Sequence, residues 1–205
     1  SAFLKGFQLI LDAQYPNGGW PQSFPPGSGY ARHITFNDDT FVRLAHLARD
    51  VAEKSDFEFV PAQTRRSARA AFEKAVECVL RTQIEVGGVL TVWCAQHDSV
   101  TLEPRPARTY ELVSLSGSES ARLLLFLMSL ENPTAEVRAA VEAGVKWFDT
   151  VKLEGVRQVR ENRERRLMAD AGAPPLWARF YEIGTNRPIF SGRDGVKKYS
   201  VDEIE

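Results

Sequence analysis

The chain has 205 residues, of which 43% are hydrophobic and 10% aromatic, so it is long enough to bury a sizeable core. Its 26 Lys and Arg against 27 Asp and Glu leave a formal net charge of -1, which excludes the basic field of a general nucleic-acid binder. No segment reaches the roughly 18 apolar residues of a membrane span. We therefore expect a single globular domain over residues 1–205, with neither nucleic acid nor membrane as partner.

The first predicted helix starts near residue 2, in SAFLKGFQLILDAQ, and the pair Gly18-Gly19 is expected to stop it. A long connection, residues 14–37, follows. It contains Pro16, Pro21, Pro25 and Pro26, and its aromatic residues include Trp20, Phe24, Tyr30 and Phe36. A connection of this length is uncommon in a compact domain unless it is functional. The aromatic residues can either fasten it to the surface or lie open as stacking platforms.

The second predicted helix, residues 38–54, begins on Asp38 and Asp39 and places apolar residues at helical spacing on one face. Asn37 or either aspartate can cap this helix and complement its dipole. Two adjacent carboxylates exceed what a cap needs. They can also hold a hard cation such as Ca²⁺, in a site assembled from distant segments or shared with an anionic substrate.

A repeat connects the first helix with a later one that includes residues 74–83. Residues identical at a spacing of 69 are Lys5 and Lys74, Leu11 and Leu80, Gln14 and Gln83, and the pairs Gly18-Gly19 and Gly87-Gly88. A weaker third copy places Phe148 and Lys152 at the same spacing from Val79 and Gln83. Self-similarity at a fixed period indicates a repeated supersecondary unit.

The second unit also has a second predicted helix, residues 116–131, in which Ser116 and Glu119 form a capping box. Helix pairs that repeat at about 70 residues favour a large helical ring over a short-repeat solenoid. We therefore predict an all-α fold, an (α/α) toroid of repeated helix pairs whose long loops line a groove.

The connection in the second unit, residues 93–120, carries most of the candidate chemistry. His97 and Asp98 can be an acid/base pair or a buried hydrogen-bonded couple. Arg105 has the pattern of a solvated charge, whereas Arg108 has Glu111 three residues later to orient it.

Two later segments are also charged. RENRERR, residues 160–166, is predicted to be a solvated, flexible loop. In residues 177–195, Arg179 lies between aromatic residues and is suited to grip a carboxylate in a bidentate fork. Zinc, nucleotide and serine-hydrolase motifs are absent from the sequence.

Four segments in this order resemble pectate lyases of polysaccharide lyase family 10. They are NGGWPQ with ITFNDD, WCAQHD, PARTYELVSLSGSES, and PLWARFYEIGTNRPIFSGRDGVKKYS. The resemblance implies a toroid whose groove binds polygalacturonate and cleaves it by calcium-dependent β-elimination. Because pectin polymers lie outside cells, it also implies a secreted protein, extracellular or periplasmic. No oligomer is implied.

The resemblance also implies roles for individual residues. Arg108 corresponds to the Brønsted base, Asp38 to a carboxylate that holds calcium, and Arg179 to a grip on the substrate carboxylate. The full set of candidates is Arg108 as catalytic residue, Arg179, Trp20, His97, Glu111 and Arg193 for substrate binding, and Asp38 and Asp39 for the metal.

Family members have an additional N-terminal segment with an Asp-Asn-Gly-Ala-Thr type motif, and they continue past VKKYSVDEIE. We therefore expect these residues to be a family domain that is incomplete at both ends. Two alternatives remain. One is a glycoside hydrolase on an (α/α) toroid that uses Asp38 and Asp98 as acid and base. The other is a non-catalytic carbohydrate-binding domain or an inactive fragment.

Overall fold

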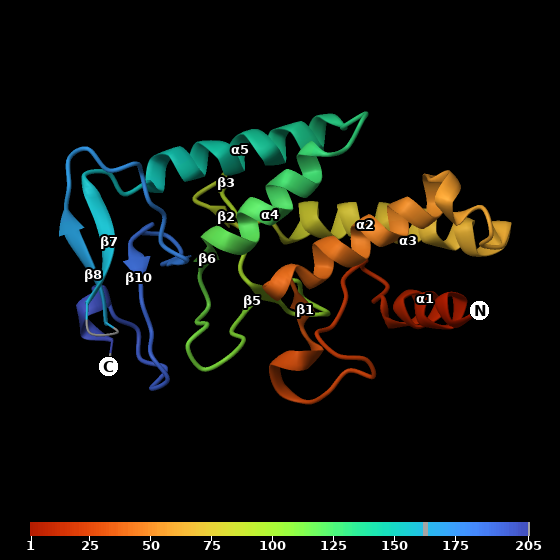
Figure 1. Cartoon of the computed structure of the whole chain (residues 1–205), viewed down its shortest axis with the longest axis horizontal. Helices are drawn as coiled ribbons and strands as arrows, with labels where there is room; N and C mark the ends of the chain where they lie inside the picture. The colour runs from red at the N-terminus through yellow and green to blue at the C-terminus, as the bar shows by residue number, and fades with distance from the viewer. Residues whose placement is uncertain (162–163, 205) are drawn as a thin grey trace.

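The computed structural model describes residues 1–161 and 164–204, in an elongated molecule with the N-terminus at one end and the C-terminus at the other (Figure 1). The helices longer than one or two turns in these ranges are α1 (Ala2–Ala13), α2 (Thr40–Glu53), α3 (Ala62–Thr82), α4 (Gly117–Met128) and α5 (Ala135–Val151). None of the helices in the described part of the chain is both long and apolar enough to cross a bilayer.

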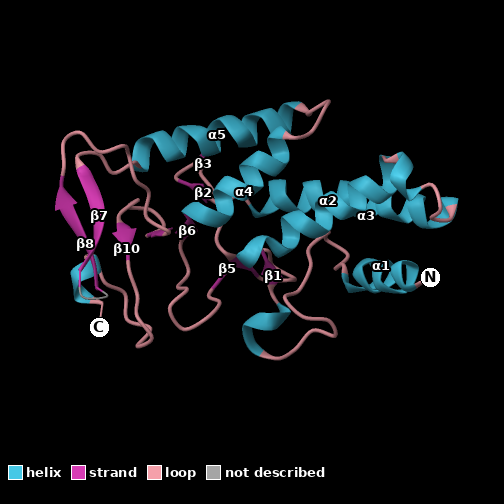
Figure 2. Ribbon diagram, in the orientation of Figure 1, coloured by secondary structure: helices cyan, strands magenta, loops and turns pink. Residues whose placement is uncertain are grey.

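Short antiparallel strands connect the helices (Figure 2). One sheet has the order β1-β4-β5, from β1 (Ile34–Thr35), β4 (Gln96–His97) and β5 (Pro104–Arg105). A second has the order β10-β9-β6, from β6 (Leu115–Ser116), β9 (Phe180–Tyr181) and β10 (Pro188–Ile189). Two hairpins complete the set: β2 (Glu85–Val86) with β3 (Val89–Leu90), and β7 (Val156–Glu161) with β8 (Glu164–Ala169).

These strands make the prediction of an all-α (α/α) toroid wrong, since about 45% of the structure is helix and 15% is strand. Apart from β7 and β8, each described strand is only two residues long. A strand of that length shows no alternation of apolar and polar residues, so periodicity cannot detect it. The predicted loop at residues 160–166 is also wrong where β7 and β8 pair, and residues 162–163 lie outside the described residues.

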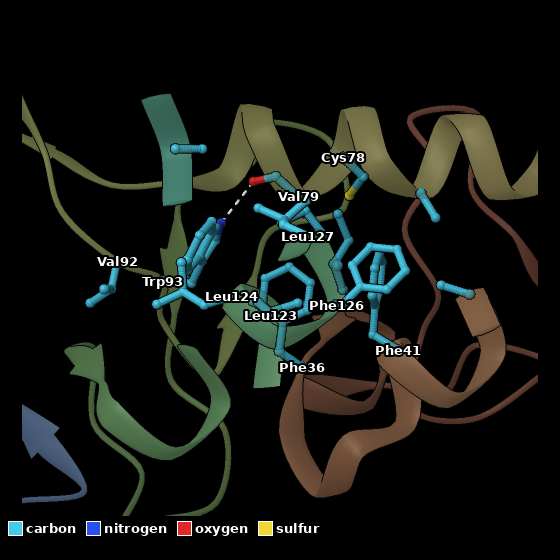
Figure 3. Packing of buried hydrophobic residues seen from close by; sticks show 14 of the residues in the cluster. Phe36, Phe41, Cys78, Val79, Val92, Trp93, Leu123, Leu124, Phe126 and Leu127 are labelled. Atoms are coloured by element: carbon cyan, nitrogen blue, oxygen red, sulfur yellow. Dashed lines mark hydrogen bonds between the residues drawn. The ribbon is translucent and has the colours of Figure 1, made fainter. Parts of the chain in front are cut away.

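The predicted apolar face of α2 is buried. Phe41, Ala45, Ala48 and Val51 are fully buried, and α2 packs against α3. The largest apolar cluster combines side chains of the four helices α2 to α5 with residues of the connecting loops (Figure 3). This core supports the loops that carry the candidate site.

The repeat predicted from the sequence recurs in the hydrogen bonds of the structure. The side-chain amide of Gln14 donates to Ala71 O (2.9 Å), and that of Gln83, its equivalent in the second unit, donates to Ala140 O (3.0 Å). Because Ala71 and Ala140 are themselves related by the spacing of the repeat, equivalent glutamines bond the end of α1 to α3 and the end of α3 to α5.

Three tryptophans repeat a second contact. The indole N–H groups of Trp20, Trp93 and Trp177 donate to the carbonyls of Ile10 (2.9 Å), Val79 (2.7 Å) and Phe148 (2.9 Å), respectively. The three acceptors follow one another at the spacing of the repeat, and Figure 3 shows the Trp93 bond inside the core. The third unit therefore has the same helix-to-loop connection as the first two.

The glycine pairs do not end the helices as expected. α1 ends at Ala13 and α3 at Thr82, each several residues before its pair. Gly87 and Gly88, with φ +60° and +80°, form the turn between β2 and β3. The predicted C-terminal role is wrong because glycine suits both kinds of turn.

Candidate active site

Three connecting segments hold the candidate residues: the 3-10 turn Asn37–Asp39 before α2, the turn of residues 108–111 between β5 and β6, and the segment that enters β9. In Figure 2 the long loops before α2, before β6 and after β10 extend on the same side of the helices. Strand pairing joins these segments. β1, just before the Asn37–Asp39 turn, pairs with β4, and β6, after the 108–111 turn, pairs with β9.

Arg108 and Glu111 form a bidentate pair within one turn. Arg108 donates from Nε to Glu111 Oε2 (2.8 Å), from Nη2 to Oε1 (2.6 Å), and from its backbone N–H to Oε2 (3.1 Å). Only 1% of the Glu111 side chain is exposed, against 35% for Arg108. Glu111 therefore orients Arg108 from beneath, and its predicted direct contact with substrate is wrong in this geometry.

Arg179 joins the same carboxylate from the entry to β9. Its Nη2 donates to Glu111 Oε1 (2.9 Å) and to Glu119 Oε1 (3.0 Å), while its guanidinium lies 4.8 Å from the ring centre of Phe180. One oxygen of Glu111 thus accepts hydrogen bonds from two arginines that are far apart in the sequence. Within the described residues, Nε and Nη1 of Arg179 and Nη1 of Arg108 have no hydrogen-bond partner.

The ionisation of this cluster follows from the same contacts. The hydrogen bonds to Glu111 raise the pKa of Arg108 above its usual value, against the smaller effect of burial. Burial alone would raise the pKa of Glu111, but the hydrogen bonds and charge of Arg108, with the charge of Arg179, hold it below its usual range. In the free protein the cluster is therefore two guanidinium groups around a carboxylate.

Asp38 and Asp39 adopt left-handed backbone conformations, with φ +56° and +60°. Such angles are uncommon outside glycine, and side-chain oxygens make Asp one of the residues that tolerates them. Asp39 occupies the N-cap position of α2 without a side-chain hydrogen bond to the helix. The prediction that the Asp39 side chain caps α2 is therefore wrong, and both carboxylates instead face arginine side chains.

Those partners differ. Asp38 Oδ2 lies 3.9 Å from Arg108 Nη2, and 64% of the Asp38 side chain is exposed. Asp39 instead pairs with Arg122 (3.4 Å) and Arg43 (3.9 Å). Two guanidinium groups therefore compete with a cation for Asp39, whereas the more exposed Asp38 has one arginine at 3.9 Å, and the metal role of both residues stays a prediction.

A calcium site fits these residues only as a shared one. Among the described residues, no group of three or more His, Cys, Asp or Glu side chains is placed to hold a metal ion. Ca²⁺ takes roughly six to eight oxygens, of which Asp38 supplies at most two. The adjacent Asn37 Oδ1 is buried without a hydrogen-bond partner among the described residues. The remaining oxygens would have to come from substrate and water.

Two further candidates lie in the core instead of at the surface. Trp20 is 1% exposed and packs edge-on against Phe41, and His97 is fully buried. His97 Nε2 accepts from the Cys94 N–H (3.2 Å), so Nδ1 donates to Leu102 O (2.8 Å). Neither side chain can contact a polysaccharide in this structure, and the prediction that they bind substrate is corrected on that ground.

His97 and Asp98 are not an acid/base pair. Burial lowers the pKa of His97 to about 4. The Asp98 carboxylate accepts from the N–H groups of Thr101 and Val100 and pairs with Arg105, and these contacts lower its pKa to about 2. A general acid needs a raised pKa, so Asp98 is unsuited to the hydrolase alternative.

Arg193 is exposed on the loop after β10. A Cβ placed on nearby Gly195 would lie only 3.1 Å from Thr109 Cγ2, so this loop packs against the turn that carries Arg108. Arg193 is therefore near the cluster, without a described contact to it.

Arg179 also borders two hollows on the surface. One, of about 430 Å³, has Tyr110, Trp177 and Phe180 in its lining. The other, of about 770 Å³, lies between α4 and α5 and is lined largely by apolar side chains. The partly exposed guanidinium therefore lies where a chain-like ligand can approach from either side.

Glu119 belongs to the arginine cluster, although the sequence predicted that it caps a helix with Ser116. The predicted capping box is wrong, because the Ser116 hydroxyl donates to the Glu119 carboxylate and not to the helix backbone. Glu119, 6% exposed, also holds Arg179. The sequence carries no signal for this contact, because Arg179 lies 60 residues later and the spacing of Glu119 from Ser116 favoured a local role.

Comparisons with known proteins agree with this geometry. Residues 1–205 match the family model described as pectic acid lyase. A mutant of a family 10 polysaccharide lyase from Cellvibrio cellulosa, in complex with trigalacturonic acid, is 37% identical with a TM-score of 0.91, and the match covers 100% of this chain and 65% of that one. A family 10 polysaccharide lyase from the same organism is 37% identical with a TM-score of 0.90, over 98% and 64% of the two chains.

None of the curated proteins compared with the chain matched it. Both similar structures are described as family 10 polysaccharide lyases. The chain belongs to the pectic acid lyase family. It spans slightly less than two thirds of the length of the two solved structures.

Proposed function

We propose that this chain carries the catalytic groove of a pectate lyase, which cleaves α-1,4-polygalacturonate by calcium-dependent β-elimination and releases 4,5-unsaturated oligogalacturonides. The observation that carries the proposal is the single oxygen of Glu111 that accepts from both Arg108 and Arg179, with Asp38 at 3.9 Å from Arg108. Two fixed, partly exposed guanidinium groups suit a polymer that has a carboxylate on every sugar. The trigalacturonic acid bound by the similar lyase supports that substrate class.

The chemistry follows from where each residue lies. Arg179, whose Nε and Nη1 have no partner in the described part of the chain, grips the C6 carboxylate of a galacturonate and stabilises the negative charge that develops there. Arg108 takes the C5 proton. The electron pair of the C5–H bond then forms the C4=C5 double bond as the C4–O bond breaks, and the leaving oxygen takes a proton from water. Arg193, on the neighbouring loop, is proposed to bind an adjacent substrate carboxylate.

Arg108 must be neutral to act as a base, and its raised pKa makes that form scarce in the free protein. Calcium held between Asp38 and the substrate would neutralise the C6 carboxylate and, as a cation near Arg108, favour the neutral guanidine. Because a base of high pKa gains its active form as the pH rises, we expect the rate to increase with pH.

We also propose that the protein acts outside the cytoplasm, extracellularly or in a periplasm, because pectin polymers are found outside cells.

The test is the ultraviolet absorbance of the conjugated product during incubation with polygalacturonate, with calcium and then with a chelator. We expect absorbance to grow only with calcium, and faster at higher pH. New reducing ends without absorbance would indicate a hydrolase. Binding without either product would indicate a carbohydrate-binding domain.

Variants separate the proposed roles. Arg108→Ala is expected to reduce turnover by at least about 1000-fold while leaving binding of polygalacturonate largely intact. Asp38→Ala should raise the calcium concentration needed for half-maximal rate. Arg81→Ala, on an exposed position of α3, is the matched control and should behave as the original protein. Near-normal turnover by the Arg108 variant would show that the base is another group.

A further inference from the structure

Glu119 lies at the start of α4 with only 6% of its side chain exposed. Its Oε1 accepts from Arg179 Nη2 (3.0 Å), and its Oε2 accepts from the Ser116 hydroxyl. A carboxylate this deeply buried costs free energy unless it is paired, so these two contacts fix its position.

The contacts form one continuous series. Ser116 holds Glu119, Glu119 and Glu111 both accept from Arg179 Nη2, and Glu111 holds Arg108 in its bidentate pair. Both glutamates therefore accept from the same nitrogen, Nη2, of the Arg179 guanidinium. The other two nitrogens, Nε and Nη1, have no partner among the described residues, and each can donate to a ligand.

Strand pairing shows that Glu119 is the counterpart of Asp38. β1 pairs with β4 as β6 pairs with β9, and each acidic residue comes three positions after the end of its strand, β1 or β6. Both face an arginine that comes later in the chain, Arg108 for Asp38 and Arg179 for Glu119. The two differ in exposure, 64% for Asp38 and 6% for Glu119. Asp38 is thus open to a ligand, whereas Glu119 can act only through its arginine.

We propose that Glu119 is a positioning residue, which holds Arg179 so that its remaining donors face the substrate carboxylate. The proposal rests on the proposed function in one respect, that Arg179 contacts galacturonate. A guanidinium whose Nη2 is held by two carboxylates loses little rotational freedom when Nε or Nη1 donates to a ligand, so those hydrogen bonds form at lower entropic cost. Without Glu119, Nη2 retains only Glu111, which it shares with Arg108.

The test is a double-mutant cycle with Glu119→Gln, Arg179→Ala and the combined variant. Gln keeps the shape of Glu119 and can still bond Ser116 and Arg179, but it removes the charge. Binding of trigalacturonate is measured by calorimetry, and turnover of polygalacturonate by the absorbance assay. We expect Glu119→Gln to weaken binding and raise KM by about 10-fold. In the Arg179→Ala background, the same change should have no further effect.

Two more variants guard against a general loss of structure. Ser116→Ala keeps both charges and should give a smaller loss, about 3-fold, in the same constants. Glu142→Gln, a surface change on α5, should leave them unaltered. Circular dichroism and the melting temperature confirm that each variant is folded.

The outcomes separate this proposal from the proposed function. Equal losses from Glu119→Gln with and without Arg179, or no loss from Glu119→Gln, would overturn the positioning role. If the protein binds trigalacturonate but forms no unsaturated product, the lyase proposal fails while the binding cycle still decides the role of Glu119.

Discussion

Burial of His97 connects a single residue to the pH dependence of stability. Because burial favours the neutral imidazole, its pKa is about 4 in the folded protein, below the ordinary 6.5 that applies when the chain unfolds. The unfolded state therefore binds more protons below about pH 6.5. The stability that His97 contributes is complete above that pH and is lost as the pH falls towards about 4.

We predict that lowering the pH from about 7 to about 5 reduces the free energy of unfolding by roughly 2 kcal/mol through His97. His33 and His46, whose pKa values burial also lowers, change the stability in the same direction. His97→Gln, whose amide can still donate to Leu102 O, should remove most of this slope in urea unfolding at the two pH values. An unchanged slope in the variant would mean that His97 does not titrate in this way.

Contacts between residues close in the sequence were predictable, whereas contacts between distant residues were not. The pairing of Arg108 with Glu111 was predictable, because the two are three positions apart in one turn. The second partner of Glu111, Arg179, was not, since that contact depends on how β9 pairs with β6. Trp20 has the residue type of a stacking platform, but its indole N–H bonds to Ile10 O within the core.

Helices followed from the sequence more readily than strands. α2, α4 and α5 lie where spacing or repetition predicted helices, because an apolar face of several turns leaves a clear period. Two-residue strands leave no such period. Their pairing is decided by contacts between distant loops, as when Ile34 of β1 meets His97 of β4.

The loop after α1 requires glycine at position 18, where it passes close to α3. Gly18 has a φ of +91°, and a Cβ placed on it would lie 2.0 Å from the backbone oxygen of Lys74 in α3. We predict that Gly18→Ala lowers the free energy of unfolding by about 2 to 4 kcal/mol, because the backbone cannot yield without displacing α3. Chemical denaturation at a fixed pH measures this.

Gly87→Ala is the matched control. Gly87 also has positive φ, +60°, but a Cβ there would meet nothing within 4 Å. Gly87→Ala should lower the free energy of unfolding by only about 1 kcal/mol, because it adds only the strain of the left-handed conformation. Equal losses of unfolding free energy for the two variants would show that the close contact between Gly18 and the Lys74 backbone does not affect stability.

Across the whole molecule, the repeat was the most far-reaching feature that the sequence supplied. Its fixed spacing correctly related the first helices of three units, as the Gln and Trp hydrogen bonds confirm. The sheets do not follow one spacing, because the loops between helices and strands differ in length. A search for a single fixed period therefore detects the helices and misses the strands that bring Asp38, Arg108 and Arg179 together.

The three equivalent tryptophans test how evenly the repeat is stabilised. Trp93 is fully buried, whereas Trp177 is 46% exposed, although both donate to a carbonyl at the same position of their units. Trp93→Phe should lower the free energy of unfolding by about 2 to 3 kcal/mol, from a lost buried hydrogen bond and the cavity left by the smaller ring.

Trp177→Phe should cost less than about 1 kcal/mol, because water can satisfy the Phe148 carbonyl and little volume is emptied. Denaturant unfolding of both variants gives the comparison directly. If Trp177→Phe were as damaging as Trp93→Phe, the third unit would have to be as tightly packed as the second. The exposed indole and the hollow of about 770 Å³ beside it predict the opposite, a molecule whose stability decreases from its centre towards the unit that carries Arg179.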